Sequence, residues 1–429
     1  RGIKVEQSIE DQVIDSVFSG ENILLTGAAG CGKTTIENSM KLLLESDTVC
    51  LGSTGLAALL NGGMTSHKAL SMPFGIPLEE DYNAFWSTAS KTTKTLFGPK
   101  SPITRIFFDE VGMTTSYQMH WMDFALKKLY RTDKPFGGLQ VCLFGDVSQL
   151  EPVVKSQERQ FIMNSFGGVN FFETQAFIDG NFQIYNLKEV KRQDNQEMIK
   201  HLNNIRVYGY NFNLKESLDY FNDQCLGKPF EDSNFMVTTN ARCDEINKQK
   251  FAQLNTKIHK FKATRKGQMK ETPAPEMLEL REGCRVIILK NHPDKLYVNG
   301  SVGTVHKINK FGVEVLLENG KIVDLDTTTW ENYSYDINSE GKLYKKKVGS
   351  YSQYPLRLAY SSTIHKNQGV SCDSANIDLG KRVFASGMTY VALSRVRTIE
   401  GIRLLRPLNK FDVIENKAVL NFYKKHQLI

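Results

Sequence analysis

The chain has 429 residues, of which 41% are hydrophobic and 24% charged, as in ordinary soluble globular proteins, and it is too long for one compact core. Its net charge of +7 allows a polyanionic partner without requiring one. No apolar run of about 18 residues and no charged-then-apolar leader occurs, so we expect neither a membrane-spanning segment nor a secretion signal. The seven cysteines are dispersed with no CxxC pair, which favours reduced thiols and an intracellular setting over a disulfide framework or a zinc site.

A glycine-rich motif lies near the start of the chain, where residues 27–34 read GAAGCGKT. The apolar run 22–26 precedes it as a strand would, and residues 34–46 follow with apolar side chains at helical spacing. In this context the motif predicts a phosphate loop, because glycines let the backbone approach a triphosphate and the helix N-terminus directs N–H groups at it. Lys33 would reach the β and γ phosphates, and Thr34 would hold Mg²⁺. A chance glycine-rich turn, the alternative, would not need the flanking strand and helix.

Strand-like and helix-like segments alternate through residues 1–180. This alternation predicts an α/β fold with a parallel sheet and crossover helices. The stretch 71–101 interrupts it with prolines, glycines and the aromatic residues Phe74, Phe85 and Trp86, and we interpret it as an inserted subdomain. The strand candidates are Ile23–Thr26, Val49–Leu51, Ile106–Asp109 and Val141–Phe144, and the helix candidates are 34–46, 55–61 and 116–130.

A second α/β pattern begins near residue 182, with a helix at 195–206, a strand at 234–239 and a helix at 241–254. Short β-rich runs follow, with the turn signal Asn319-Gly320, and they predict a small β-barrel insertion. The predicted domains are therefore 1–70 with 102–181, the inserted 71–101, 182–255 with 351–429, and the inserted 256–350.

Polar side chains follow two of the predicted strands. Asp109 at a strand end can hold Mg²⁺ through water, and the adjacent Glu110 can orient and deprotonate the attacking water. Gln149, shortly after the strand 141–144, can sense the γ-phosphate from the carboxyl edge of the sheet, where ligands of such folds bind. Alone, these residues could equally be a solvated strand end and a capped loop. The phosphate loop in the same α/β domain favours the catalytic interpretation.

Two arginines, Arg192 and Arg395, could act as arginine fingers if ATP lies between the two α/β domains. Arg192 stands in LKEVKRQ at 187–193, and Arg395 ends YVALSR at 390–395. Spacing alone makes each more typical of a surface arginine.

Eight further segments carry a family resemblance: STGLAA at 53–58, TSH at 65–67, DEVGM at 109–113, PFGG at 135–138, GDVSQLEPV at 145–153, NGSVG at 299–303, TIHKNQG at 363–369 and YVALSR at 390–395. With Gln12 ahead of the phosphate loop, these segments resemble the Pif family of 5′-to-3′ DNA helicases, within superfamily one, group B, over most of the chain. PFGG after a helical segment separates this family from RecD-like relatives, which share the ATPase motifs but generally lack it. The sequence departs from the family pattern at Cys31, Gly112 and Glu151, none of which is a catalytic group.

The resemblance implies two RecA-like P-loop domains, with 71–101 as a wedge and 256–350 as a β-barrel, and it implies ATP and Mg²⁺ as cofactors. It also assigns roles to single residues. Those implied to bind nucleotide are Gln12, Gly27, Gly30, Gly32, Lys33, Thr34 and Thr35; the metal ligands are Thr34 and Asp109; the catalytic groups are Lys33, Glu110, Gln149, Arg192 and Arg395; and the DNA contacts are Thr54, Gly55, His67, Thr239, Asn240, His365 and Lys366.

The implied activity is DNA-dependent ATP hydrolysis that drives 5′-to-3′ translocation on single-stranded DNA and unwinding of forked or tailed duplexes, and of G-quadruplexes. The resemblance suggests a compact bacterial or viral helicase, cytoplasmic and nucleoid-associated, monomeric but able to dimerise on DNA, from a family concerned with DNA repair, recombination and telomere maintenance. Two alternatives stay open: a RecD-like subunit of a larger machine, and a nucleotide-switched module that binds single-stranded DNA with little unwinding. We interpret Phe74, Phe85 and Trp86 as packing residues rather than base-stacking ones.

Overall fold

The computed structural model describes residues 7–53, 63–73, 75–190, 195–207, 213–231, 233–269, 272–294, 296–297, 299–337, 343–368 and 371–428, with the side chains of 333–337 and 343–346 left aside. The predicted helix 55–61 lies outside the described residues, as do Phe74 and the candidate site residues Thr54, Gly55 and Arg192. The chain divides into two compact units, one of residues 1–191, 333–347 and 416–429, the other of 192–332 and 348–415.

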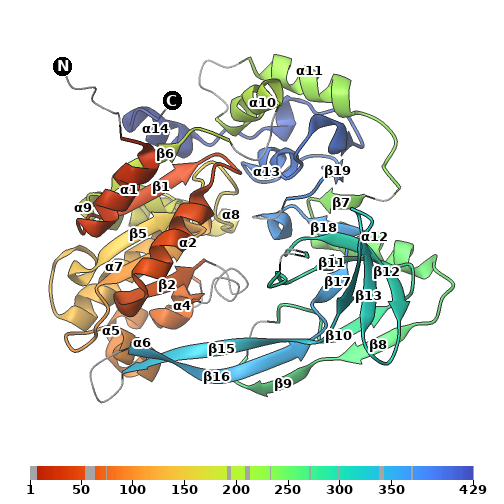
Figure 1. Ribbon diagram of the computed structural model, residues 1–429. Coiled ribbons are helices and arrows are strands. Elements are labelled where there is room, and N and C mark those ends of the chain that lie inside the picture. Colours follow the sequence, from red (N-terminus) through yellow and green to blue (C-terminus); the bar gives the residue numbers. More distant parts are fainter. Residues whose placement is uncertain are drawn as a thin grey trace, which may run out of the picture. The chain divides into compact units, whose positions relative to one another are not determined.

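The described part of the first unit contains a six-stranded parallel sheet in the order β3-β2-β4-β5-β1-β6 (Figure 1). The strands β1 and β5 are buried along their whole length, which is why they read as continuous apolar runs without alternation. The sheet confirms the predicted α/β class, and the four predicted strands end within one residue of the observed ones. The strands are β1 (Ile23–Gly27), β2 (Thr48–Gly52), β3 (Met64–Thr65), β4 (Arg105–Asp109), β5 (Gln140–Phe144) and β6 (Gln183–Leu187).

Helices α1 and α2 pack on this sheet through one apolar cluster, which joins Val13 of α1 and Met40 of α2 to Leu25 of β1 (Figure 1). Helix α14, near the C-terminus, also belongs to this unit. The ring centroid of its Phe422 lies 4.6 Å from that of Phe172. The predicted division assigned 416–429 to the second domain; the aromatic contact accounts for the difference. The helices are α1 (Ile9–Phe18), α2 (Lys33–Leu43), α4 (Ser66–Ala69), α5 (Glu79–Thr88), α6 (Lys91–Leu96), α7 (Ser116–Tyr130), α8 (Ser156–Phe166), α9 (Gln175–Asp179) and α14 (Lys417–Lys425).

The stretch 71–101 contains α5 and α6 and is packed on α7 by aromatic rings. Phe85 is buried, with its ring centroid 5.8 Å from that of Trp121 on α7. Trp121 in turn donates a hydrogen bond from Nε1 to the carbonyl oxygen of Leu70, at 3.1 Å. Phe85 is therefore a packing residue, as we interpreted it, whereas the neighbouring Trp86 is exposed.

The PFGG segment is a tight turn (η3, Pro135–Gly138) that connects α7 to β5. Phe136 is buried in a left-handed backbone conformation, with a φ of 50°, and its N–H donates to Asp123 Oδ1 of α7 at 2.7 Å. Gly137 follows with a φ of 68°, and a Cβ there would lie 2.7 Å from the carbonyl oxygen of Leu126. The motif is thus explained by backbone geometry that packs the turn against α7.

Within the described residues, the second unit contains a four-stranded parallel sheet in the order β18-β7-β19-β20. This sheet confirms the second α/β pattern seen in the sequence. Its strands are β7 (Asn234–Val237), β18 (Ser361–Thr363), β19 (Ala375–Asp378) and β20 (Ile402–Leu404), and the helices of the unit are α10 (Gln196–Arg206), α11 (Leu214–Cys225), α12 (Asn240–Ala252) and α13 (Met388–Ser394).

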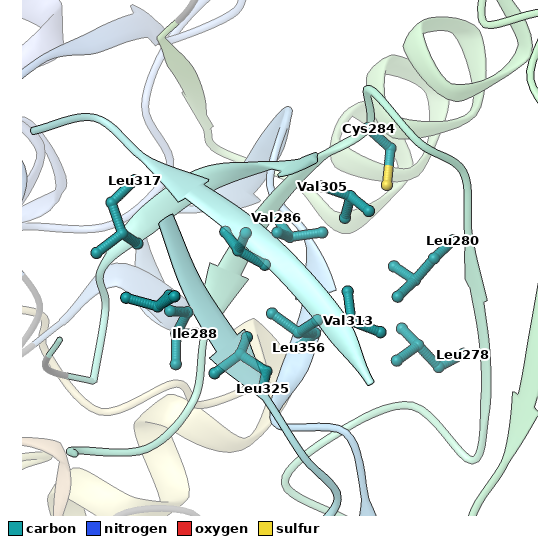
Figure 2. Close-up of a cluster of buried hydrophobic side chains, with 12 residues drawn as sticks. Leu278, Leu280, Cys284, Val286, Ile288, Val305, Val313, Leu317, Leu325 and Leu356 are labelled. Atoms are coloured by element: carbon teal, nitrogen blue, oxygen red, sulfur yellow. The ribbon is translucent and has the colours of Figure 1, made fainter. Parts of the chain in front are cut away.

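The region predicted as a β-barrel supplies four strands of an antiparallel sheet in the order β14-β13-β12-β11-β17, and β17 follows that region in the sequence. Figure 2 shows its apolar core, in which Val286, Val305 and Val313 lie among leucines from neighbouring strands. The predicted turn at Asn319-Gly320 joins β13 to β14, with Gly320 at a φ of 81°. Closure of these strands into a barrel stays a prediction. The strands are β8 (His259–Lys262), β9 (Thr264–Gly267), β10 (Met277–Leu280), β11 (Arg285–Ile288), β12 (Val302–Ile308), β13 (Val313–Leu317), β14 (Ile322–Leu325), β15 (Thr328–Ile337), β16 (Leu343–Gln353) and β17 (Leu356–Leu358).

None of the helices in the described ranges combines the length and the apolar character needed to cross a membrane.

Candidate nucleotide-binding site and DNA-contact residues

The glycine-rich loop runs from the end of β1 to the start of α2, as predicted. Gly27, Gly30 and Gly32 have φ angles of 152°, 79° and 92°, which side chains with a Cβ rarely adopt. A Cβ on Gly27 would also lie 2.6 Å from the carbonyl oxygen of Leu187 on β6. The loop therefore needs glycine for its conformation, and α2 begins directly behind it, at Lys33. A helix N-terminus in this position directs backbone N–H groups toward an anion.

Lys33 folds its side chain over the loop. Its Nζ donates hydrogen bonds to the carbonyl oxygens of Gly27, at 2.9 Å, and Ala28, at 3.0 Å. The side chains of Thr34 and Thr35, on the first turn of α2, are exposed. The ammonium and the Thr34 hydroxyl are thus both at the loop, where a triphosphate and its cation would need them.

The predicted carboxylate pair lies at the end of β4. Asp109 is the last residue of the strand, and its Oδ1 accepts a hydrogen bond from the backbone N–H of Glu110 at 2.8 Å. Glu110 has a left-handed backbone conformation, with a φ of 53° and a ψ of 40°, which is unusual for a residue with a side chain. Such outliers gather at functional sites, where the surrounding structure holds them in place.

The loop after β5 packs closely against the loop after β4. A Cβ on Gly112 would lie 2.8 Å from the carbonyl oxygen of Asp146, so glycine permits this approach. Asp146 is buried, and its Oδ1 accepts from the N–H of Ser148 at 2.9 Å. The N–H of Gln149 donates to the Asp146 carbonyl at 3.2 Å. Because β4 and β5 are adjacent parallel strands, the structure places Gln149 at the same sheet edge as Asp109 and Glu110.

Glu37 is a buried acid that we did not predict from the sequence. It lies on α2, is 1% exposed, and its Oε1 lies 2.5 Å from Nζ of Lys41, one turn later. Burial, and then the charge of Asp109, raise the pKa of Glu37 to about 8. The charge of Asp109, at the end of β4, is thus one of the causes of the raised pKa of Glu37. The sequence signal for this buried acid was a glutamate between Ile36 and Met40, two apolar positions on the buried face of α2.

Gln12, the candidate adenine-reading residue, is exposed on α1, where its Nε2 donates to the carbonyl oxygen of Gln7 at 3.0 Å. His67 lies on the short helix α4, and burial lowers its pKa. A neutral imidazole can accept a hydrogen bond or donate one, but it contributes no fixed positive charge.

Four of the predicted DNA contacts follow the carboxyl ends of two adjacent parallel strands in the second unit. Strands β7 and β18 are parallel neighbours, with Val237 opposite Thr363. Thr239 and Asn240 follow β7, and His365 and Lys366 follow β18, so both pairs lie beyond the carboxyl ends of adjacent strands. Thr239 Oγ1 caps α12 by accepting the N–H of Arg242 at 3.3 Å, and Asn240 and Lys366 are exposed.

Arg395 follows α13 and is 1% exposed, so the alternative of a surface arginine is wrong. Its Nε donates to the Val391 carbonyl at 3.1 Å, and its Nη2 donates to Ser394 Oγ at 3.1 Å. The other candidate arginine finger, Arg192, lies outside the described residues.

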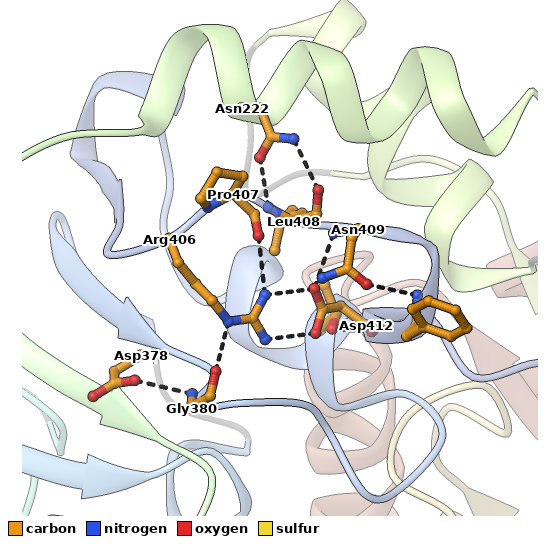
Figure 3. Close-up of polar contacts among 10 residues, drawn as sticks. Asn222, Asp378, Gly380, Arg406, Pro407, Leu408, Asn409 and Asp412 are labelled. Carbon is orange, nitrogen blue, oxygen red and sulfur yellow. Dashed lines mark hydrogen bonds and ion pairs between the residues drawn. The ribbon is translucent and has the colours of Figure 1, made fainter.

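An ion-pair cluster holds the segment that packs on α13 (Figure 3). The Nη2 and Nη1 atoms of Arg406 bond to Asp412 Oδ1 and Oδ2, each at 2.6 Å, and Arg406 Nε donates to the carbonyl oxygen of Gly380. Thr389, in the first turn of α13, donates from Oγ1 to the Asp412 carbonyl. We call Arg406, Asp412 and Gly380 the arginine clasp. Nothing in the sequence patterns indicated it.

A glycine-rich loop between β1 and α2, with a lysine on it and carboxylates at the end of β4, defines a P-loop nucleotide-binding protein. Residues 3–208 match the family model described as PIF1-like helicase. The ATP-dependent DNA helicase Pif1 of Bdellovibrio bacteriovorus is 28% identical over 99% of this chain and 93% of its own length.

Two solved structures are similar along the whole chain. The crystal structure of Bacteroides sp Pif1 in complex with ADP-AlF4 has a TM-score of 0.89 and 30% identity, covering 99% of this chain and 98% of its own. Bacteroides Pif1 bound to ssDNA has a TM-score of 0.70 and 31% identity, covering 100% and 98%. The chain therefore belongs to the PIF1-like helicase family.

Proposed function

We propose that the chain is an ATP-dependent DNA helicase that moves 5′-to-3′ along single-stranded DNA and unwinds forked or tailed duplexes. The observation that carries this proposal is a fully formed phosphate loop, with Lys33 at its helix and Asp109 and Glu110 at the end of β4. Family membership supports DNA as the partner, and the phosphate loop supports ATP as the nucleotide.

ATP with Mg²⁺ fits the residues at the loop. The positive φ angles of Gly30 and Gly32 let the backbone N–H groups turn toward phosphate oxygens, and the exposed Thr34 hydroxyl stands at the first turn of α2. Thr34 and Asp109 would hold the metal, which neutralises phosphate charge when bound. Lys33 would exchange its two loop carbonyls for phosphate oxygens, which form stronger, charge-assisted hydrogen bonds.

Hydrolysis needs a base and positive charge at the γ-phosphate. Glu110 would take a proton from the attacking water, and its left-handed backbone conformation is of the kind that gathers at functional sites. Gln149, at the same sheet edge, would report the presence of the γ-phosphate. Arg395 and Arg192 would stabilise the charge that develops in the transition state.

The single strand would run along the sheet edge that carries Thr239, Asn240, His365 and Lys366, with His67, Thr54 and Gly55 as contacts on the first unit. The structure of the Bacteroides relative bound to ssDNA supports this choice of partner. Hydroxyl, amide and ammonium groups would grip phosphates without reading sequence, which a motor that tracks any strand requires. We extend the proposal to a monomer that dimerises on DNA, to 71–101 as the wedge, and to G-quadruplexes as substrates.

The rival functions predict different behaviour. A nucleotide-switched binding module needs no catalytic base, so a complete set of Lys33, Glu110 and Arg395 favours a motor. A RecD-like subunit would depend on partner chains, and the PFGG turn is instead the feature that sets the Pif family apart.

The decisive experiment uses forked DNA with one single-stranded tail at a time. Wild type should unwind the fork that carries a 5′ tail and leave the fork with only a 3′ tail intact. Its ATP turnover should rise many-fold when single-stranded DNA is added. Glu110→Gln is the matched control: it should bind both ATP and the strand but unwind neither fork, since an amide cannot accept the proton. Unwinding from the 3′ tail would refute the direction, and ATP turnover that ignores DNA would refute the motor.

A further inference from the structure

An exposed aromatic ring lies beside one of the residues assigned to the DNA track. Phe384 is 58% exposed and lies between β19 and α13. Its ring is nearly parallel to the imidazole of His365, with an angle of 14° between the planes and 6.2 Å between the centroids. Single exposed apolar residues are common on proteins, so exposure alone carries little. Phe384 differs from them because its ring lies next to His365, a predicted DNA contact.

The segment that carries Phe384 is fixed at both ends. On one side, Gly380 donates its N–H to Asp378 Oδ1 at 2.9 Å and accepts from Arg406, as Figure 3 shows. On the other side, Ser386 Oγ donates to the carbonyl oxygen of Ile414 at 3.0 Å. Val383, next to Phe384, is buried. The backbone therefore presents the ring to solvent from a held position, and a ligand that stacks on it would lose little conformational entropy.

The surroundings of the ring suit a nucleic-acid strand. His365 is half-buried, burial lowers its pKa, and it is therefore a neutral aromatic ring near pH 7. Its Nε2 is buried, and among the described residues it has no hydrogen-bond partner. Lys366, Lys381 and Arg382, adjacent in sequence to the two rings, are exposed cations. Aromatic rings among cations form the usual surface that binds a single strand, stacking its bases and neutralising its phosphates.

We propose that Phe384 is a base-stacking residue: one unpaired nucleobase of the bound strand lies on its exposed face, beside a phosphate held by Lys366. Every base has a π-face, so this contact would strengthen binding without reading sequence. The inference rests on the proposed function, because it needs single-stranded DNA as the partner.

The test measures the affinity of the full chain for a fluorescein-labelled oligothymidylate by anisotropy at fixed salt. Phe384→Leu should raise Kd about 5- to 20-fold, whereas Phe384→Trp should bind like wild type. The control is Phe311→Leu: that ring is 78% exposed and lies beside a lysine, on the turn between β12 and β13, and the substitution should leave Kd unchanged. Phe384→Leu should keep the wild-type dependence of log K on log salt, because it removes no phosphate contact. Lys366→Ala should reduce that slope by about 1.

An oligonucleotide of abasic sites separates stacking from other roles of the ring. Wild type and Phe384→Leu should bind it equally, since there is no base to stack. Equal affinity of the two proteins for oligothymidylate, or a difference that persists on the abasic strand, would overturn the inference. If Phe384→Leu melts at a lower temperature than wild type, the test relies instead on the fluorescence of Phe384→Trp. Its added fluorescence should be quenched by oligothymidylate and not by the abasic strand, and no quenching by either would overturn the inference. If wild type itself does not bind oligothymidylate, the proposed function fails, a result distinct from a failure of Phe384 alone.

Discussion

Replacing Arg406 of the arginine clasp should destabilise the second unit more than replacing its partner Asp412. The two side chains share two short bonds, but they differ in access to water: Asp412 is 1% exposed and Arg406 is 26% exposed. In Arg406→Met, the Asp412 carboxylate would stay buried, with the N–H of Asn409 at 2.9 Å as a remaining donor. Breaking a buried pair in this way costs about 3–5 kcal/mol, because a charge is left without compensation.

Asp412→Asn should destabilise the second unit less, because the charge that it leaves unpaired is the partly exposed guanidinium of Arg406. The amide keeps the shape of the carboxylate, and the guanidinium of Arg406 still donates to the carbonyl oxygens of Gly380 and Pro407. It can also reach water. The loss should then be about 1.5–3 kcal/mol, the range for charge-assisted hydrogen bonds. The difference between the two variants is therefore roughly 2 kcal/mol.

Hydrogen exchange of the α13 amides measures this difference, because Thr389 in the first turn of that helix bonds to the Asp412 carbonyl. A gap of about 2 kcal/mol should make exchange roughly 30-fold faster in Arg406→Met than in Asp412→Asn. Arg397→Met, which removes an exposed pair with Asp373 at 3.5 Å in the same unit, is the control and should change exchange by less than about fivefold. Equal effects of the two clasp variants, or a larger effect of Asp412→Asn, would refute the reasoning from burial.

Three further predictions concern the phosphate loop and its helix. Lys33→Ala should lower steady-state ATP hydrolysis by orders of magnitude while binding of single-stranded DNA survives, since the lost ammonium belongs to the nucleotide site; turnover like wild type would remove Lys33 from that site. Gly27→Ala should weaken nucleotide affinity, measured by titration with a fluorescent ATP analogue, because the new Cβ would lie 2.6 Å from the Leu187 carbonyl oxygen, whereas Gly20→Ala, with open space at its Cβ, should not. Folding raises the pKa of Glu37 from 4.5 to about 8, so between these pH values the folded chain holds a proton that the unfolded chain has released. The free energy of unfolding should therefore fall as the pH rises from about 4.5 to about 8. Glu37→Gln should therefore gain stability relative to wild type between those pH values in urea titrations, and a constant difference across the window would contradict the assignment.

The parts of the site that the sequence predicts correctly have local causes. The phosphate loop needs glycine at Gly27, Gly30 and Gly32 because the backbone there has positive φ, and an apolar run and an amphipathic helix flank it in sequence. Asp109 and Glu110 close a buried strand, so their position at the sheet edge follows from the strand itself. Parallel strands bring such ends together, and the α/β class follows from the alternation of segments.

The features that sequence reasoning missed depend on contacts between distant segments. The raised pKa of Glu37 comes from burial and then from the charge of Asp109, 72 positions later in the sequence (109 − 37 = 72), so the helical pattern around Glu37 gives only part of the cause. The packing of Phe422 on Phe172 decides where α14 belongs, and no local pattern states it. The strands β15 and β16 were likewise missed: they form a three-stranded sheet with β9, a segment far from β15 in the sequence, so the pairing depends on contacts that no local pattern states.

The hydrogen bonds of the Arg395 guanidinium are compatible with the role proposed for it, in which it would leave its present partners for a phosphate. Its Nε and Nη2 bond to Val391 and Ser394, which lie on its own helix, so these contacts are available in any arrangement of the two units. Bonds of this kind, from a charged guanidinium to a neutral oxygen, contribute about 1.5–3 kcal/mol, and a phosphate oxygen would add the attraction between opposite charges. Under the proposed function, phosphate oxygens would take the place of these partners, provided that the helix itself stays in place. The clasp meets that condition, because Asp412 holds the first turn of α13 through Thr389 while Arg395 leaves from the other end.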